Sequence, residues 1–148
     1  MRANVIRVIL TITVVAFSVS AQTRGGAARP VDLAGTSWQL VKLQGGDDET
    51  SVPDDGSKYT ITFGKNGRVT SRVDCNRGSS TWKLKGSNEL EFGSWSMTRA
   101  KCPPGSLHDR IVTEGAAVRY FSIKNGHLFL SGMAAGGYYE LEPLTTRR

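Results

Sequence analysis

The chain has 148 residues, 39% of them hydrophobic and 22% charged, and a formal net charge of +6 at pH 7. This length is enough for one compact domain and too short for two. The charge excess lies on the flanks, at Arg2, Arg7, Arg24, Arg29, Arg147 and Arg148, whereas residues 32–144 carry balanced charges. Because a nucleic-acid binder needs a clustered basic face on the fold itself, we expect no nucleic-acid partner.

Residues 1–21 have the layout of a secretory signal peptide. Arg2 and Arg7 precede the apolar run Val8–Val19, and small residues close the segment before Gln22. The run is too short to span a bilayer, which disfavours a retained anchor. No cysteine near the cleavage site could carry a lipoprotein's acyl chain. We therefore expect a periplasmic or secreted protein without a stable membrane anchor, starting at Gln22.

The first part of the mature chain combines an irregular segment, a strand and an acidic loop. Residues 22–31 have no apolar period and predict a flexible lead-in. Asp32–Leu43 predicts a strand with Trp38, Leu40 and Lys42 on one face and Leu43 on the other. Residues 45–58 form an acidic loop without the alternating ligand pattern of a calcium site, so we interpret it as solvated.

Three hairpins are predicted next. Tyr59–Phe63 and Arg68–Asp74 flank Asn66-Gly67, a dipeptide typical of a type I′ turn, in which both central residues have positive φ. Within Val69–Trp82, Cys75-Asn76 interrupts a strand-like run. The other two hairpins pair Thr81–Lys85 with Glu89–Gly93, and fold Tyr120–Leu130 about a second Asn-Gly. A final strand, Gly137–Pro143, places Tyr139 and Leu141 on one face.

One helix is predicted, at Ser106–Val118. Ser106 can cap it and Asp109 completes a capping-box spacing. An apolar stripe recurs at helical spacing, formed by Leu107, Ile111, Val112, Gly115 and Val118. His108 lies off this stripe, so we interpret it as solvated rather than catalytic. Seven or eight short strands with one helix predict a mainly β fold, a small antiparallel barrel or strongly curved sheet.

The chain has two cysteines, Cys75 and Cys102. In an oxidising compartment two cysteines usually pair, and this bridge would stabilise the fold by roughly 3–4 kcal/mol. A reactive thiol or a metal ligand is the alternative, but cysteine metal sites need further Cys or His at short spacing. We expect a disulfide, no metal and no cofactor.

Four motifs then resemble a known family. They are Leu33–Trp38 (Leu-Ala-Gly-Thr-Ser-Trp), Cys75-Asn76-Arg77, Thr98–Cys102 and Gly126–Leu130. In order and spacing they resemble the META domain of HslJ-like bacterial proteins, over about residues 32–144, which leaves 145–148 as a basic tail. The resemblance implies a lipocalin-like barrel with one packed helix. It also implies an exported or envelope protein linked to heat shock, antibiotic tolerance or virulence, with no defined activity.

The resemblance transfers no catalytic residue. The motif positions Gly35, Thr36, Trp38, Asn76, Arg77 and Thr98 are interpreted as structural. The chain departs from the family pattern at Ser71, Asp74 and Ser80, where glycines are common, and at Trp82, where tyrosine is usual.

No catalytic constellation is recognisable in the sequence. His108 and His127 are the two histidines, and no nucleophile elbow, zinc motif or phosphate loop accompanies them. We therefore expect no enzyme, with an unrecognised hydrolase as the remote alternative.

Asn76 and Arg77 are the most notable polar pair. Asn76 either takes a positive-φ turn or bonds local backbone, as Asn commonly does, or the two residues form a binding patch beside the disulfide. The three tryptophans Trp38, Trp82 and Trp95 either fill the core or line a ligand site in a partly open barrel.

These observations favour a monomeric, non-enzymatic exported protein that acts through protein contacts under stress. The alternative is a small barrel that binds an apolar ligand or inhibits an exported enzyme.

Overall fold

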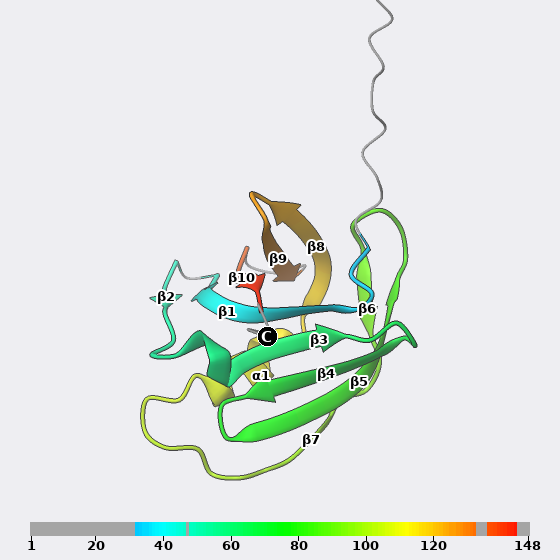
Figure 1. Cartoon of the computed structure of the whole chain (residues 1–148). Helices are drawn as coiled ribbons and strands as arrows, with labels where there is room; N and C mark the ends of the chain where they lie inside the picture. The colour runs from blue at the N-terminus through cyan, green and yellow to red at the C-terminus, as the bar shows by residue number, and fades with distance from the viewer. Residues whose placement is uncertain (1–31, 47, 133–135, 145–148) are drawn as a thin grey trace, which may run out of the picture.

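The computed structural model describes residues 32–46, 48–132 and 136–144 (Figure 1). The predicted signal peptide, lead-in and basic tail lie outside these residues. The first half holds β1 (Thr36–Gln44), β2 (Thr50–Ser51), a 3-10 turn at Gly56–Lys58, β3 (Tyr59–Phe63), β4 (Arg68–Val73) and β5 (Asn76–Leu84). The second half holds β6 (Leu90–Phe92), β7 (Ser96–Met97), α1 (His108–Gly115), β8 (Val118–Lys124), β9 (His127–Gly132) and β10 (Tyr138–Pro143).

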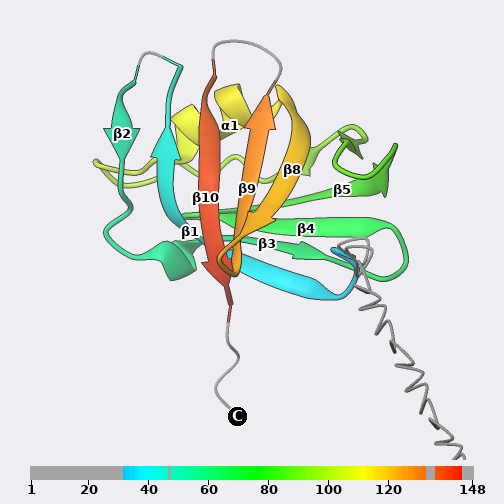
Figure 2. The same cartoon turned by 90° about the horizontal axis from the view of Figure 1, so that it is seen from above.

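The strands form one antiparallel sheet that curves almost into a closed barrel. Its order is β6-β5-β4-β3-β1-β10-β9-β8, with β2 paired to β1 and β7 to β5. The two end strands approach each other at a bridge between Glu89 and Tyr120, where Phe121 N donates to Asn88 O at 2.9 Å. Figure 2 shows α1 behind the ends of β9 and β10. The predicted fold class, a small antiparallel barrel with one helix, is confirmed.

β1 begins later and alternates differently than predicted. A turn at Leu33–Thr36 precedes it, with Gly35 at φ 79°. Its pairing with β10 shifts register between Leu40 and Lys42, so that one extra residue is accommodated. Leu43 is fully buried as a result, while Lys42 Nζ lies 3.4 Å from Glu140 Oε2. The predicted faces of Lys42 and Leu43 are wrong because simple alternation cannot anticipate a bulge.

The two Asn-Gly turns differ. Asn125 (φ 52°) and Gly126 (φ 80°) form the predicted two-residue turn. In the β3–β4 loop Gly67 has positive φ (74°) and Asn66 does not, so the type I′ prediction is wrong there. Four residues separate β3 from β4, and longer loops use a left-handed glycine after an ordinary turn.

The Cys75-Asn76 segment joins two strands of one hairpin. β5 starts at Asn76, which is opposite Val73 of β4. Asp74, with φ 56°, is the left-handed residue of the turn. The apparent interruption is therefore a chain reversal, and β5 is longer than the Thr81–Lys85 strand predicted from the sequence.

The helix is shorter than predicted, because Ser106 and Leu107 precede it and Val118 belongs to β8. Ser106 Oγ accepts a hydrogen bond from His108 N at 3.1 Å. Asp109 bonds the His108 ring rather than completing a capping box. Every residue of α1 is at least partly exposed, and Val112 is 44% exposed. This helix is neither long nor apolar enough to cross a membrane, and no other described helix is.

The core is packed most tightly around Phe63, which is fully buried. Its ring centroid lies 5.1 Å from that of Trp82 in an edge-on arrangement and 6.3 Å from that of Phe92. Inward residues of the other strands, including Trp38, Leu128 and Leu141, extend this cluster. The interior beneath α1 is not filled by side chains in this way.

Candidate functional site

A cavity of about 530 Å³ lies between α1 and the barrel interior. The strands contribute apolar side chains such as Leu40, Ile61 and Leu130, and Trp95 and Met97 border it from the segment around β7. Ile111, Val112 and Gly115 contribute the helix side of the lining. Part of the apolar stripe predicted for the helix therefore faces a space, and Ile111, Val112 and Gly115 stay partly exposed.

The lining also includes polar residues, and two of these contain a buried polar atom. Ser71 Oγ and His108 Nε2 are buried, and neither has a hydrogen-bond partner in the part of the chain that the structure describes. Both residues line the cavity. Buried polar atoms are almost always hydrogen-bonded, so each of these exceptions requires an explanation. Less than 1 Å² of each atom is accessible, so a polar group of a bound molecule would reach them only where neighbouring side chains move apart.

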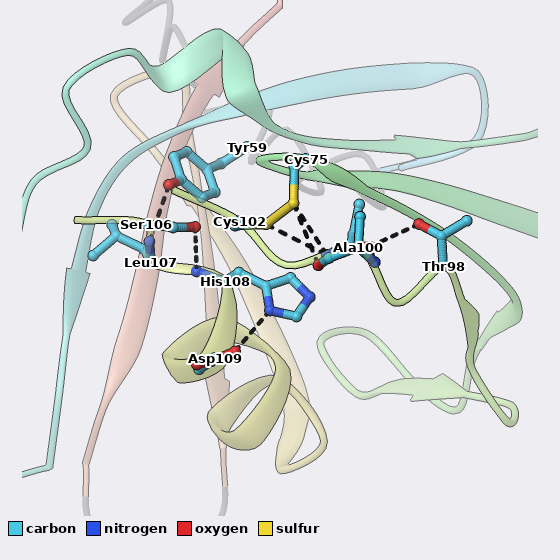
Figure 3. Close-up of polar contacts among 10 residues, drawn as sticks. Tyr59, Cys75, Thr98, Ala100, Cys102, Ser106, Leu107, His108 and Asp109 are labelled. Atoms are coloured by element: carbon cyan, nitrogen blue, oxygen red, sulfur yellow. Dashed lines mark hydrogen bonds and ion pairs between the residues drawn. A yellow bond between two sulfur atoms is a disulfide. The ribbon is translucent and has the colours of Figure 1, made fainter. Parts of the chain in front are cut away.

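The hydrogen-bonding role of His108 follows from its other ring nitrogen. Nδ1 lies 2.9 Å from Oδ1 of Asp109, and an ionised carboxylate only accepts hydrogen bonds (Figure 3). Nδ1 therefore carries a proton, and in the neutral ring Nε2 is an acceptor. The side chain is 18% exposed, so the prediction that His108 is solvated is wrong.

Ser71 owes its position to a glycine on the neighbouring strand. Val69, Ser71 and Val73 share the inner face of β4, and Ser71 is paired with Gly78 of β5. A Cβ on Gly78 would lie 2.7 Å from Ser71 Oγ and 2.9 Å from Met97 Cε. Because Gly78 has no side chain, there is room for Ser71 Oγ and for the end of the Met97 side chain.

Two tyrosines attach the helical segment to the barrel. Tyr59 Oη accepts from Leu107 N at 3.0 Å, and Tyr139 Oη donates to Ile111 O at 3.4 Å. Burial raises the pKa of the Tyr139 hydroxyl, and the Glu114 carboxylate adds to the shift. The hydroxyl therefore stays neutral and remains a donor across the physiological pH range.

A side-chain staple fixes the rim of the cavity. We use this term for Asn76, Thr98, Ala100 and the Cys75–Cys102 disulfide. Asn76 is fully buried; its Nδ2 donates to Ala100 O at 2.9 Å, and its Oδ1 accepts from Ala100 N at 2.8 Å and from Thr98 Oγ1 at 2.9 Å. Cys75 and Cys102 are joined, as predicted, with their sulfurs 2.05 Å apart. Figure 3 shows the disulfide beside Ala100 and Thr98.

Asn76 thus does not act in the way the sequence suggested. It has no positive φ, and the backbone that it bonds belongs to Ala100, distant in the sequence. The side-chain amide of Asn76 gives the backbone of Ala100 one hydrogen-bond donor and one acceptor, as a neighbouring strand would. Arg77 is exposed, and its Nη1 donates to Asp74 O at 3.2 Å and Asn76 O at 3.1 Å.

The remaining motif residues build the start of β1. Trp38 Nε1 donates to Thr36 Oγ1 at 2.8 Å, and that hydroxyl donates to Leu33 O at 2.6 Å. Gly35 N donates to Phe63 O at 2.6 Å. Among the described residues of the motifs that carried the resemblance, Thr98, Arg99 and Leu130 line the cavity, and Gly35, Thr36, Trp38, Asn76 and Arg77 do not. Of the tryptophans, Trp38 is buried, Trp82 packs on Phe63, and Trp95 lines the cavity.

The described residues include no group of three or more His, Cys, Asp or Glu arranged to hold a metal ion. His127, the second histidine, has its Nδ1 2.8 Å from Glu140 Oε1, on the β9–β10 pair. The polar chemistry of the cavity therefore rests on Ser71, His108 and the charged residues at the rim.

Residues 31–142 match the META domain profile. The chain belongs to the META domain family. A protein from Burkholderia xenovorans solved by NMR has a similar fold, with a TM-score of 0.62 and 20% identity over 78% of this chain and 85% of that one. A duf4847 family protein from Bacteroides vulgatus ATCC 8482 has a TM-score of 0.53 and 16% identity, over 74% of this chain and 93% of that one. No curated protein matches the chain.

These similarities establish the fold of this META domain. Sequence reasoning also missed the two unpartnered atoms of its cavity. The one sequence signal for these atoms was Ser71 itself, which occupies a position where the family commonly has a glycine. His108 gave no signal, because its burial depends on where α1 lies against the barrel.

Proposed function

We propose that this META domain binds a small, mostly apolar molecule in the cavity beneath α1, without catalysis. The observation that carries the proposal is the cavity itself, of about 530 Å³ and lined mainly by apolar side chains with two unpartnered polar atoms. Ligand sites typically occupy about 300–1,000 Å³ and combine an apolar lining with a few convergent polar groups. The cavity has this composition.

The distribution of exposed apolar side chains favours ligand binding over the protein-contact hypothesis. Val52, Leu84 and Val112 are the large hydrophobic residues exposed within the described ranges, and they come from the loop after β2, from β5 and from α1. Val112 itself lines the cavity. A specific protein interface usually has a contiguous patch with a well-packed apolar centre, for which these residues provide little support.

The arrangement of Ser71 and His108 supports the proposal that catalysis is absent. A serine nucleophile needs a base within hydrogen-bond reach. Ser71 Oγ and His108 Nε2 are both without a partner among the described residues, so they do not bond each other. We also retain export as part of the proposal, since a disulfide is typical of oxidising compartments.

The proposal can be tested with a neutral apolar dye. N-phenylnaphthylamine should fluoresce on binding to the wild-type protein. Gly115→Leu should weaken binding at least tenfold, because a Cβ there meets only Tyr139 Oη, at 3.6 Å, and the larger side chain would extend into the cavity.

Gly86→Leu is the matched control, since a Cβ at this exposed glycine meets nothing within 4 Å and residue 86 is not part of the cavity lining. Circular dichroism should show that both variants fold. Equal dye binding by wild type and a folded Gly115→Leu variant, or no binding by wild type, would contradict the proposal.

A further inference from the structure

We propose that the polar end of the ligand is a carboxyl group, so that the cavity takes a monocarboxylic acid with an apolar tail. This inference rests on the proposed function and adds the chemistry of the head group. It draws on the charges of the lining, on the two unpartnered atoms and on the position of the rim.

The charge of the lining favours an acid. None of the described residues that line the cavity is an aspartate or glutamate, whereas Arg99 and His108 are present. Arg99 is exposed at the rim and has no hydrogen bond or ion pair to another described residue. Arg72 also borders the cavity, but strand alternation puts its side chain on the outer face, where Nε donates to Asp74 O at 3.2 Å. We therefore count Arg99, and not Arg72, as a partner for an anion.

A carboxyl group also fits the two unpartnered atoms. With Nδ1 of His108 bonded to Asp109, the neutral ring offers a lone pair at Nε2, which a carboxylic acid O–H can bond. If the proton resides on the ring instead, the imidazolium N–H donates to a carboxylate. One proton shared between the two groups therefore satisfies His108 in either state. The Ser71 hydroxyl can donate to an oxygen of the same ligand.

Other head groups match less of the site. An alcohol could donate to His108 and accept from Ser71, but it would give Arg99 no counter-charge. A quaternary ammonium group has no hydrogen-bond donor and would meet Arg99 with like charge. The staple holds Thr98 and therefore positions Arg99, the next residue, at the rim.

The test compares ligands with the same tail. Decanoic acid, decanol and decyltrimethylammonium should each be titrated, as monomers, against the dye-loaded protein. We expect the acid to displace the dye about tenfold more strongly than the alcohol, because a hydrogen bond to a charged group contributes more than one between neutral groups. The ammonium compound should be the weakest.

Variants separate the contributions of the head-group residues. Arg99→Gln and His108→Phe should each reduce the preference for acid over alcohol by about three- to tenfold, while alcohol binding changes little for Arg99→Gln. Lys101→Gln is the matched control, because Lys101 is an exposed base in the same loop that does not line the cavity.

Two outcomes are distinguishable. If acid and alcohol compete equally, or if Lys101→Gln has the same effect as Arg99→Gln, the carboxyl assignment is wrong while the apolar cavity function stands. If wild-type protein binds neither the dye nor any of the three compounds, the proposed function fails and the carboxyl assignment fails with it.

Discussion

The inward residues of β3 show two contrasting regions along a single strand. Phe63, at the end of the strand, is fully buried against the rings of Trp82 and Phe92. Tyr59 and Ile61 have the same orientation, but they border the cavity beneath α1. Both regions of β3 alternate inward and outward residues, as a half-buried strand does. They differ in whether side chains fill the barrel interior opposite the inward residues. Inward orientation thus predicts burial, but not whether the interior is filled.

The difference follows from side-chain volume. Large rings from β5 and β6 close the interior around Phe63. The lining of the cavity includes Ser71 and Gly115, which are small, and the covering element is a helix of eight residues. Three predictions can break or sharpen this comparison.

The largest effect is expected at the packed end. Phe63→Ala should lower the free energy of unfolding by about 3–5 kcal/mol, since it removes a large ring from a filled site. Ile111→Ala, at the cavity, should cost about 1 kcal/mol, because part of the side chain already faces open space. Urea denaturation of both variants gives the two values. Similar losses would show that the interior beneath α1 is filled.

The disulfide should have the next largest effect. Replacing Cys75 and Cys102 by serine should lower the unfolding free energy by about 2–4 kcal/mol, because the crosslink restricts the unfolded chain. Denaturation with and without a reductant provides the comparison, and the serine variant should not respond to the reductant. Two free thiols on titration of the unfolded, unreduced protein would show that the bridge is absent.

The smallest effect is expected at the helix. Gly115→Ala should raise the unfolding free energy by about 0.5–1 kcal/mol, because alanine favours the helix and its Cβ meets only Tyr139 Oη, at 3.6 Å. Gly78→Ala should destabilise instead, since its Cβ would lie 2.7 Å from Ser71 Oγ. Thermal melts rank the two variants. Destabilisation by Gly115→Ala would indicate that no room exists beneath α1.

Local patterns predicted much of this fold. Period-two alternation placed Tyr139 and Leu141 on one face of β10, and both are buried. The Asn125-Gly126 turn and the Cys75–Cys102 bridge also follow from short-range chemistry and compartment. Each of these inferences needs only neighbouring residues or a single pair.

Two of the failures, at the β1 bulge and at the cavity, have a common cause, because each depends on distant partners. The β1 bulge is defined by pairing with β10, at the other end of the chain. The two unpartnered atoms come from β4 and α1, and they share one cavity only after the barrel has curved. A sequence pattern that spans a few residues contains no information about contacts between residues that are far apart in the chain.

The staple also has a consequence for hydrogen exchange. Ala100 lies outside the strands, where an amide would ordinarily exchange quickly. Its N–H is bonded to the fully buried Asn76, and its C=O is bonded to the same side chain. Exchange at Ala100 therefore requires its hydrogen bond to Asn76 to break, so the rate at this single amide would report how often the staple opens.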